Sequence, residues 1–147
     1  MNQEVVILIA EDDEGHAVLI QKNLKRAGLI NPLIHFEDGQ KILDFLFCKG
    51  PGPHRTPGTS YLLLLDIRMP KVDGIEVLRQ VKGDKALCRI PITMITTTDD
   101  PREVNTCHEL GCSNYITKPI DYEKFIETTR QLGLFLSIVQ VPSVNGD

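Results

Sequence analysis

Acidic, hydroxyl and amine side chains follow apolar runs of the sequence, at the points where those runs end. Glu11 and Asp12 come directly after VVILIA, and Asp66 comes directly after LLLL. Thr96 follows ITMI, and Lys118 follows NYIT. Carboxylates, a hydroxyl and an ammonium can hold a divalent cation, attack phosphorus and stabilise a phosphoryl group. These side chains form one chemical site only if the fold brings the ends of the runs together.

The apolar runs alternate with segments of helical spacing, five times along the chain. This alternation predicts a doubly wound α/β domain, in which a mostly parallel sheet carries helices on both faces. VVILIA and LLLL are unbroken apolar runs, which is typical of central parallel strands buried on both faces. The expected strands lie within residues 5–10, 33–36, 61–65, 92–95 and 115–116.

In an open α/β sheet, sites form beyond the carboxyl ends of the strands, so the polar side chains should meet at one edge. Singly, each has an ordinary explanation, because acids cap helices and hydroxyls and lysines are common at strand ends. These ordinary explanations do not account for the acids as a group. Each pair of like charges at about 4 Å costs about 4 kcal/mol at an effective dielectric constant of about 20. Lys118 supplies one positive charge, and an all-oxygen site open to water favours Mg²⁺ as another. Asp66 is then the candidate nucleophile, with Thr96 as a donor to a phosphoryl oxygen.

Composition excludes several classes of protein. The chain has 147 residues, a normal size for one domain, and 16 basic against 20 acidic residues give a formal net charge of −4. No basic run marks a nucleic-acid surface, so direct DNA binding is not expected. The N-terminus has neither a positive leader region nor enough apolar residues to span a membrane, so we expect a cytoplasmic protein without membrane contact.

The four cysteines show neither the CxxC pairing of a zinc site nor the density of a disulfide scaffold. We expect reduced, mostly buried thiols. A metal site formed by Cys107, His108 and Cys112 remains an alternative. Residues 49–60, KGPGPHRTPGTS, predict an exposed loop between the second helix and the third strand. Nucleotide-binding glycine motifs do not occur, so nucleotide binding is not favoured.

Local signals mark the beginnings of two helices. Asp100 predicts an N-cap, Pro101 a first helical position and Glu103 the glutamate of a capping box. Asp121 opens the last helix in the same way.

Four motifs, in this order and spacing, resemble the response regulator receiver domain of two-component signalling. They are the Glu11–Asp12 pair, LLLLDIRMPKVDG, PITMITT and YITKP, within residues 4–132. The resemblance implies a flavodoxin-like sheet of order 2-1-3-4-5, and a phosphohistidine on a sensor histidine kinase as the phosphoryl donor.

The resemblance also implies the roles of individual residues. Asp66 would be the phosphoacceptor. Mg²⁺ would be held by Asp12, by Asp66, by the backbone carbonyl of Arg68 and, mainly through water, by Glu11.

Three further roles follow from the resemblance. Thr96 and Lys118 would contact the phosphoryl group. Tyr115 would be an aromatic switch residue together with Thr96, and phosphorylation would shift the face formed by the fourth helix, fifth strand and fifth helix. The alternative for Tyr115 is a half-buried strand tyrosine without such a role.

Arg68 departs from the family pattern. A long cation two residues after the acceptor can pair with the phosphoryl group or obstruct attacking water, so we predict altered autodephosphorylation.

The end of the chain is a second departure. Residues 134–141, LFLSIVQV, are apolar at six of eight positions. We expect a receiver domain over residues 1–133 and an apolar extension over 134–147, with no output domain. The extension resembles that of single-domain regulators paired with phytochrome kinases, so we expect a homodimer and a phytochrome as candidate kinase. The predicted dimer contacts are Phe135, Leu136, Ile138 and Val139, and the alternative is a last helix that packs further along its own sheet.

Two other functions compete with a phosphoacceptor signalling protein. A phosphatase with an Asp nucleophile would need a second Asp at position 68, where this chain has Arg68. An adaptor that binds partners without being phosphorylated would not need the complete set of polar residues. We therefore expect no enzymatic activity beyond the protein's own phosphorylation and dephosphorylation, with an unidentified downstream protein as target.

Overall fold

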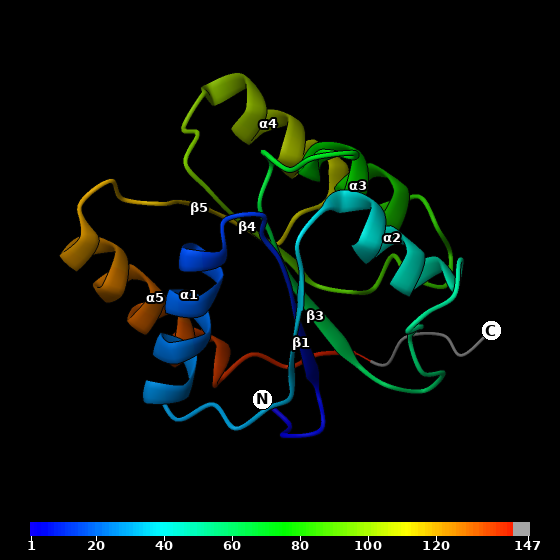
Figure 1. Cartoon of the computed structure of the whole chain (residues 1–147), viewed down its shortest axis with the longest axis horizontal. Helices are drawn as coiled ribbons and strands as arrows, with labels where there is room; N and C mark the ends of the chain where they lie inside the picture. The colour runs from blue at the N-terminus through cyan, green and yellow to red at the C-terminus, as the bar shows by residue number, and fades with distance from the viewer. Residues whose placement is uncertain (143–147) are drawn as a thin grey trace.

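The computed structural model describes residues 1–142, in which five strands alternate with five helices (Figure 1). The strands are β1 (Val6–Ala10), β2 (Leu33–Phe36), β3 (Tyr61–Leu65), β4 (Ile92–Thr96) and β5 (Asn114–Thr117). The helices are α1 (Glu14–Arg26), α2 (Gly39–Phe47), α3 (Gly74–Lys82), α4 (Pro101–Leu110) and α5 (Tyr122–Leu136). The predicted alternation of strands and helices is confirmed.

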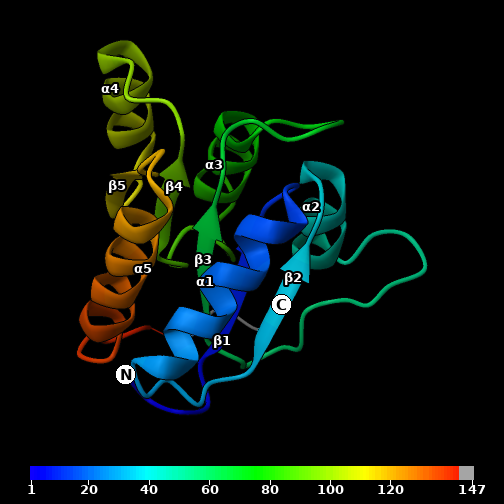
Figure 2. The same ribbon diagram turned by 60° about the vertical axis from the view of Figure 1, so that its left-hand side comes forward.

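All five strands are parallel and lie in the order β2-β1-β3-β4-β5. Helices α1 and α5 lie side by side on one face of the sheet, and α2, α3 and α4 cover the other (Figures 1 and 2). This is the predicted doubly wound, flavodoxin-like arrangement. It brings the carboxyl ends of all strands to one edge.

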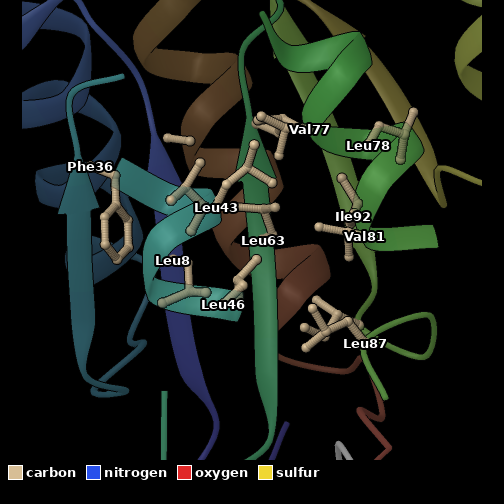
Figure 3. Close-up of a cluster of buried hydrophobic side chains, with 14 of the residues drawn as sticks. Leu8, Phe36, Leu43, Leu46, Leu63, Val77, Leu78, Val81, Leu87 and Ile92 are labelled. Carbon is tan, nitrogen blue, oxygen red and sulfur yellow. The ribbon is translucent and has the colours of Figure 1, made fainter. Parts of the chain in front are cut away.

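Successive residues of the central strands enter two different cores. Leu8 and Leu63 contribute to the core beneath α2 and α3, which Figure 3 shows in close-up. Ile7 and Leu64 contribute to the core beneath α1 and α5. Burial on both faces explains why the strand sequences are unbroken rather than alternating.

The helices α1 and α5 approach each other closely. A Cβ atom added to Gly133 would lie 2.6 Å from the Cβ of Ala27, so only glycine allows this separation. Deeper in the same seam, the buried Asn23 amide donates to the Thr129 hydroxyl at 2.9 Å. The seam therefore holds α5 firmly against α1.

Aspartates cap every helix, with side chains that accept backbone N–H groups of the first turn. The predicted N-caps Asp100 and Asp121 are confirmed. None of the helices in residues 1–142 combines the length and the apolar character that crossing a membrane requires.

The loop of residues 49–60 is mostly exposed, as predicted, but it is tied to the domain. Arg55 donates from its Nε to the Leu46 carbonyl at 2.9 Å, and the Thr56 N–H donates to the Tyr61 hydroxyl at 2.8 Å. The expectation of mostly buried thiols is only half right. Cys107 and Cys112 are buried, whereas Cys48 at the end of α2 and Cys88 in the turn region after α3 are exposed.

The apolar tail divides between the protein's own core and its surface. Helix α5 continues through Leu136, so the predicted domain boundary after Gly133 lies within a helix. Leu136 is 1% exposed and Val139 packs partly against the core beneath α1 and α5, whereas Phe135 is 46% and Ile138 73% exposed. The prediction that Leu136 makes a dimer contact is therefore wrong for this conformation, because the side chain fills the protein's own core. Residues 143–147 of the predicted extension lie outside the described residues.

Candidate functional site

The sheet register places two acids side by side. Strands β1 and β3 are neighbours with Ala10 opposite Leu65, and the Asp66 N–H donates to the Ala10 carbonyl at 3.0 Å. Glu11 and Asp66 are the next residues of the two strands, so their side chains emerge at adjacent positions. This pairing follows directly from the two apolar runs that precede them.

Asp12 joins this pair. The carboxylates of Glu11, Asp12 and Asp66 each offer an oxygen within 4.8 Å of the others. Glu11 is 1% and Asp66 5% exposed, whereas Asp12 is exposed, so water reaches the cluster from the side of Asp12. Within residues 1–142, no other three His, Cys, Asp or Glu side chains bring ligand atoms so close.

Lys118 crosses the strand end of β4 to reach the acids. Its backbone N–H donates to the Thr96 carbonyl at 2.6 Å, and its ammonium pairs with Glu11 and, at 3.2 Å, with Asp66. The Lys118 side chain is 2% exposed. The ammonium is therefore held by protein groups.

His16 also contacts this ammonium, with its Nδ1 atom 3.1 Å from the Lys118 Nζ. Sequence analysis did not identify His16. The available signal was its position in the first turn of the helix that follows the first strand, which places it at the same edge of the sheet as Asp12.

The cluster carries more negative than positive charge. Three carboxylates face one ammonium, and the pKa of Glu11 is raised to about 8, first by burial and then by the neighbouring charge of Asp66. Hydrogen bonding from Lys118 acts in the opposite direction but does not compensate. Additional positive charge at this position would therefore stabilise the ionised cluster.

Thr96 contributes a buried hydroxyl to the same edge. The residue is 0% exposed, and its Oγ1 is the one buried side-chain nitrogen or oxygen in residues 1–142 without a hydrogen-bond partner. An unpaired buried hydroxyl is unfavourable, so this atom is suited to an acceptor that arrives from outside the protein.

A glycine shapes the loop after Asp66. A Cβ atom on Gly74 would lie 2.0 Å from the Asp66 carbonyl oxygen, and the Gly74 N–H donates to the Ile67 carbonyl at 2.8 Å. Helix α3 therefore begins against the backbone that carries Asp66. The glycine that closes the LLLLDIRMPKVDG motif is required by this close approach.

Arg68 points away from the acids toward α4. Its guanidinium pairs with Glu103 at 2.8 Å, and the other Glu103 oxygen accepts the Thr98 hydroxyl at 2.7 Å. The predicted capping box is therefore wrong, because the Glu103 side chain bonds to Arg68 and Thr98 rather than to the backbone of Asp100. The ion pair joins the loop after β3 to the first turn of α4.

Tyr115 lies at the end of this chain of contacts. Its hydroxyl donates to the Thr98 carbonyl at 2.8 Å, and burial raises its pKa to about 12. The side chain is half-buried. The β4–α4 loop thus contacts Arg68 through Glu103 and contacts Tyr115 directly.

The acidic cluster fits a hard divalent cation better than the cysteines fit any metal. Carboxylate oxygens beside open solvent are ligands that suit Mg²⁺. Cys107, His108 and Cys112 do not form a group of three close ligand atoms within residues 1–142, and burial raises the pKa of the Cys107 thiol to about 11. The alternative site at Cys107, His108 and Cys112 is not supported.

The comparison with protein families agrees with this geometry. The family model of the response regulator receiver domain matches residues 7–130. Response regulator Rcp1 from Synechocystis is 32% identical over 143 residues, which cover 97% of this chain and 96% of Rcp1.

Solved structures of response regulators are also similar to this chain. A response regulator receiver domain from Rhodospirillum rubrum is 45% identical with a TM-score of 0.90, and the match covers 96% of this chain and 99% of the other. The Mn²⁺-bound form of Rcp1 is 31% identical with a TM-score of 0.83, covering 93% and 98%. The phosphorylated cyanobacterial phytochrome response regulator RcpA is 27% identical with a TM-score of 0.82, covering 94% and 98%.

The excess of negative charge predicts that Asp66→Asn stabilises the protein when no divalent ion is present. The change removes one of the crowded charges, while Lys118 keeps its partner Glu11. We expect the free energy of unfolding in chelator-containing buffer to rise by about 1–3 kcal/mol. Chemical denaturation measures this, and added Mg²⁺ should stabilise the variant less than the wild type.

Glu109→Gln is the matched control, because it removes an equal charge from an exposed position on α4. Equal effects of the two changes would show that net charge matters and crowding at the cluster does not.

Proposed function

The chain belongs to the response regulator receiver domain family, and on this basis we propose that it accepts a phosphoryl group from a sensor histidine kinase onto Asp66 in the cytoplasm, with Mg²⁺ as cofactor. The observation that carries the proposal is the surroundings of Asp66. This buried carboxylate lies between a buried ammonium and two further acids, at an edge where the Thr96 hydroxyl has no partner.

The reaction is a phosphoryl transfer between two protein side chains. One Asp66 oxygen attacks phosphorus, an O–P bond forms, and the N–P bond to the donor imidazole breaks. The imidazole nitrogen keeps the electron pair and takes a proton from solvent. Positioning and neutralisation of charge account for most of the rate enhancement in such transfers.

Each residue of the site has a distinct part in this transfer. Lys118 is already 3.2 Å from Asp66 and donates to one phosphoryl oxygen, and Thr96 donates its free hydroxyl to another. Asp12, Asp66 and the Arg68 carbonyl would ligate Mg²⁺, with Glu11 acting through water. Mg²⁺ bound there supplies positive charge that neutralises the phosphoryl oxygens.

We propose that the contact between Tyr115 and the Thr98 carbonyl couples phosphorylation of Asp66 to the position of Tyr115 on the α4–β5–α5 face. When Thr96 turns toward a phosphoryl oxygen, the backbone that continues to Thr98 moves with it. Tyr115 follows, because its hydroxyl is bonded there. The population then shifts toward a different packing of α4, β5 and α5.

A phytochrome-type sensor kinase is the proposed donor. The similar proteins support this choice, since RcpA is a phytochrome response regulator that was solved in a phosphorylated form. Rcp1 was solved with Mn²⁺, which supports a divalent metal at the acids of this chain.

Phosphorylation at Asp66 predicts a stable covalent adduct. Incubation with acetyl phosphate and Mg²⁺ should add one phosphoryl group to the intact mass of the wild type and none to Asp66→Asn. Omitting Mg²⁺ should abolish the adduct in the wild type.

The other outcomes separate the competing functions. Continuous release of inorganic phosphate at a high rate would identify a phosphatase. A wild type that forms no adduct under any of these conditions would identify an adaptor that acts without phosphorylation.

Arg68 is proposed to slow the loss of the phosphoryl group. Arg68→Ala should speed autodephosphorylation, because it removes a cation that can pair with the phosphoryl group and obstruct water. A partly exposed ion pair is worth up to about 1 kcal/mol, which corresponds to about a fivefold change in rate. The decay of phosphorylated protein, followed by intact mass after removal of acetyl phosphate, measures this rate.

Glu103→Gln gives an independent check, because it releases Arg68 from its partner on α4. We expect decay as slow as in the wild type or slower. An unchanged decay rate in Arg68→Ala would contradict the proposed role.

We propose that the protein forms a homodimer through the exposed part of its tail, in keeping with a receiver domain followed by an apolar extension. Phe135 and Ile138 are the exposed large apolar residues of the predicted contact set, and Leu134 beside them is 47% exposed. Val139 contributes less, because it packs partly against its own core.

The dimer is tested with surface substitutions, because truncation after Gly133 would remove the core residue Leu136. We expect Phe135→Ser with Ile138→Ser to convert a dimer to a monomer in sedimentation velocity. Ile30→Ser is the matched control, since Ile30 is 70% exposed elsewhere on the surface. A wild type that sediments as a monomer would exclude the dimer.

A further inference from the structure

The Lys118 ammonium has three hydrogens and three acceptors. Glu11 and Asp66 take two of them, and the Nδ1 atom of His16 lies at 3.1 Å for the third. Because the side chain is 2% exposed, water does not readily replace a missing acceptor. His16 therefore completes the set of acceptors around this ammonium.

Packing fixes the orientation of the His16 ring. The residue lies in the first turn of α1, where its N–H donates to the Asp13 cap at 3.0 Å. Its ring meets the buried Phe125 ring of α5 edge to face, with centroids 5.2 Å apart and planes at 86°. The ring is thus held between α5 and Lys118.

The chemistry of the contact defines the tautomer. An ammonium can only donate, so the Nδ1 atom facing it must be unprotonated, and the ring proton is on Nε2. In this contact His16 therefore acts as an acceptor through Nδ1, an atom that also lies 3.8 Å from the Asp13 carboxylate. A carboxylate at this position would add another acid to a cluster that already holds three, whereas a neutral imidazole can accept a bond from the ammonium without adding negative charge.

We propose that His16 is a positioning residue for Lys118 in phosphoryl transfer. This inference rests on the proposed function. During transfer the ammonium exchanges its bond to Asp66 for a bond to a phosphoryl oxygen. His16 and Glu11 keep the ammonium in place during that exchange. The Lys118 side chain therefore stays in one conformation, with its charge next to the phosphoryl group.

Two substitutions separate this role from packing. His16→Phe keeps an aromatic ring against Phe125 and removes the acceptor. His16→Asn removes the ring and keeps an acceptor atom at the same distance along the side chain as Nδ1. We expect His16→Phe to lower the rate of adduct formation from acetyl phosphate at saturating Mg²⁺ by about tenfold or more. His16→Asn should restore most of that rate.

Two further measurements identify the origin of the effect. The Mg²⁺ dissociation constant, measured by calorimetry, should be unchanged in both variants, because His16 is not a predicted ligand. The ¹H–¹⁵N signal of the Lys118 ammonium, assigned by its loss in Lys118→Arg, should weaken in His16→Phe and persist in His16→Asn, because a buried and fully bonded ammonium exchanges its hydrogens slowly.

The outcomes are distinct from those that test the proposed function. An ammonium signal that is unchanged in His16→Phe overturns the inference, whether or not any protein is phosphorylated. The inference also fails if His16→Phe forms adduct at the wild-type rate, if His16→Asn is as slow as His16→Phe, or if Mg²⁺ affinity falls in step with the rate. Absence of adduct in the wild type, with the ammonium signal behaving as expected, counts against the proposed function and leaves the contact to Lys118 supported.

Discussion

The concentration of negative charge at one edge of the sheet is the constraint on which the rest of the structure depends. Parallel pairing of β1 and β3 brings Glu11 and Asp66 together, and neither buried acid can move into water. The Lys118 side chain therefore extends past β4 to reach both acids. Its backbone is fixed by the hydrogen bond from the Lys118 N–H to the Thr96 carbonyl. The fold tolerates this arrangement because two separate cores, above and below the sheet, hold the strand ends in position.

The sheet and the convergence of polar groups were predictable from sequence because they follow from two local patterns. Unbroken apolar runs indicate strands buried on both faces, and the carboxyl ends of parallel strands share an edge. Glu11 and Asp66 had to be neighbours once β1 and β3 were. The resemblance of four motifs to one family added the roles of these residues, which geometry alone does not provide.

The sequence-based predictions that were wrong or incomplete have a common cause. In each case a local sequence pattern competes with a partner that lies far away in the sequence. Glu103 has the spacing of a capping box, but Arg68, in a different loop, offers a charged partner that outcompetes a backbone N–H. Leu136 belongs to an apolar stretch, and only the position of α5 on the sheet decides that it faces inward. His16 has no special spacing, and its importance depends on where the side chain of Lys118 ends.

The unpaired hydroxyl of Thr96 has a consequence for the balance between two states. A ligand shifts an equilibrium only by the difference in its interaction with the two conformers, and a group left unsatisfied in one conformer enlarges that difference. Under the proposed function, the unphosphorylated form has a higher free energy than it would have if the Thr96 hydroxyl were hydrogen-bonded. Part of the coupling free energy between Asp66 and the α4–β5–α5 face is therefore already present before the phosphoryl group arrives.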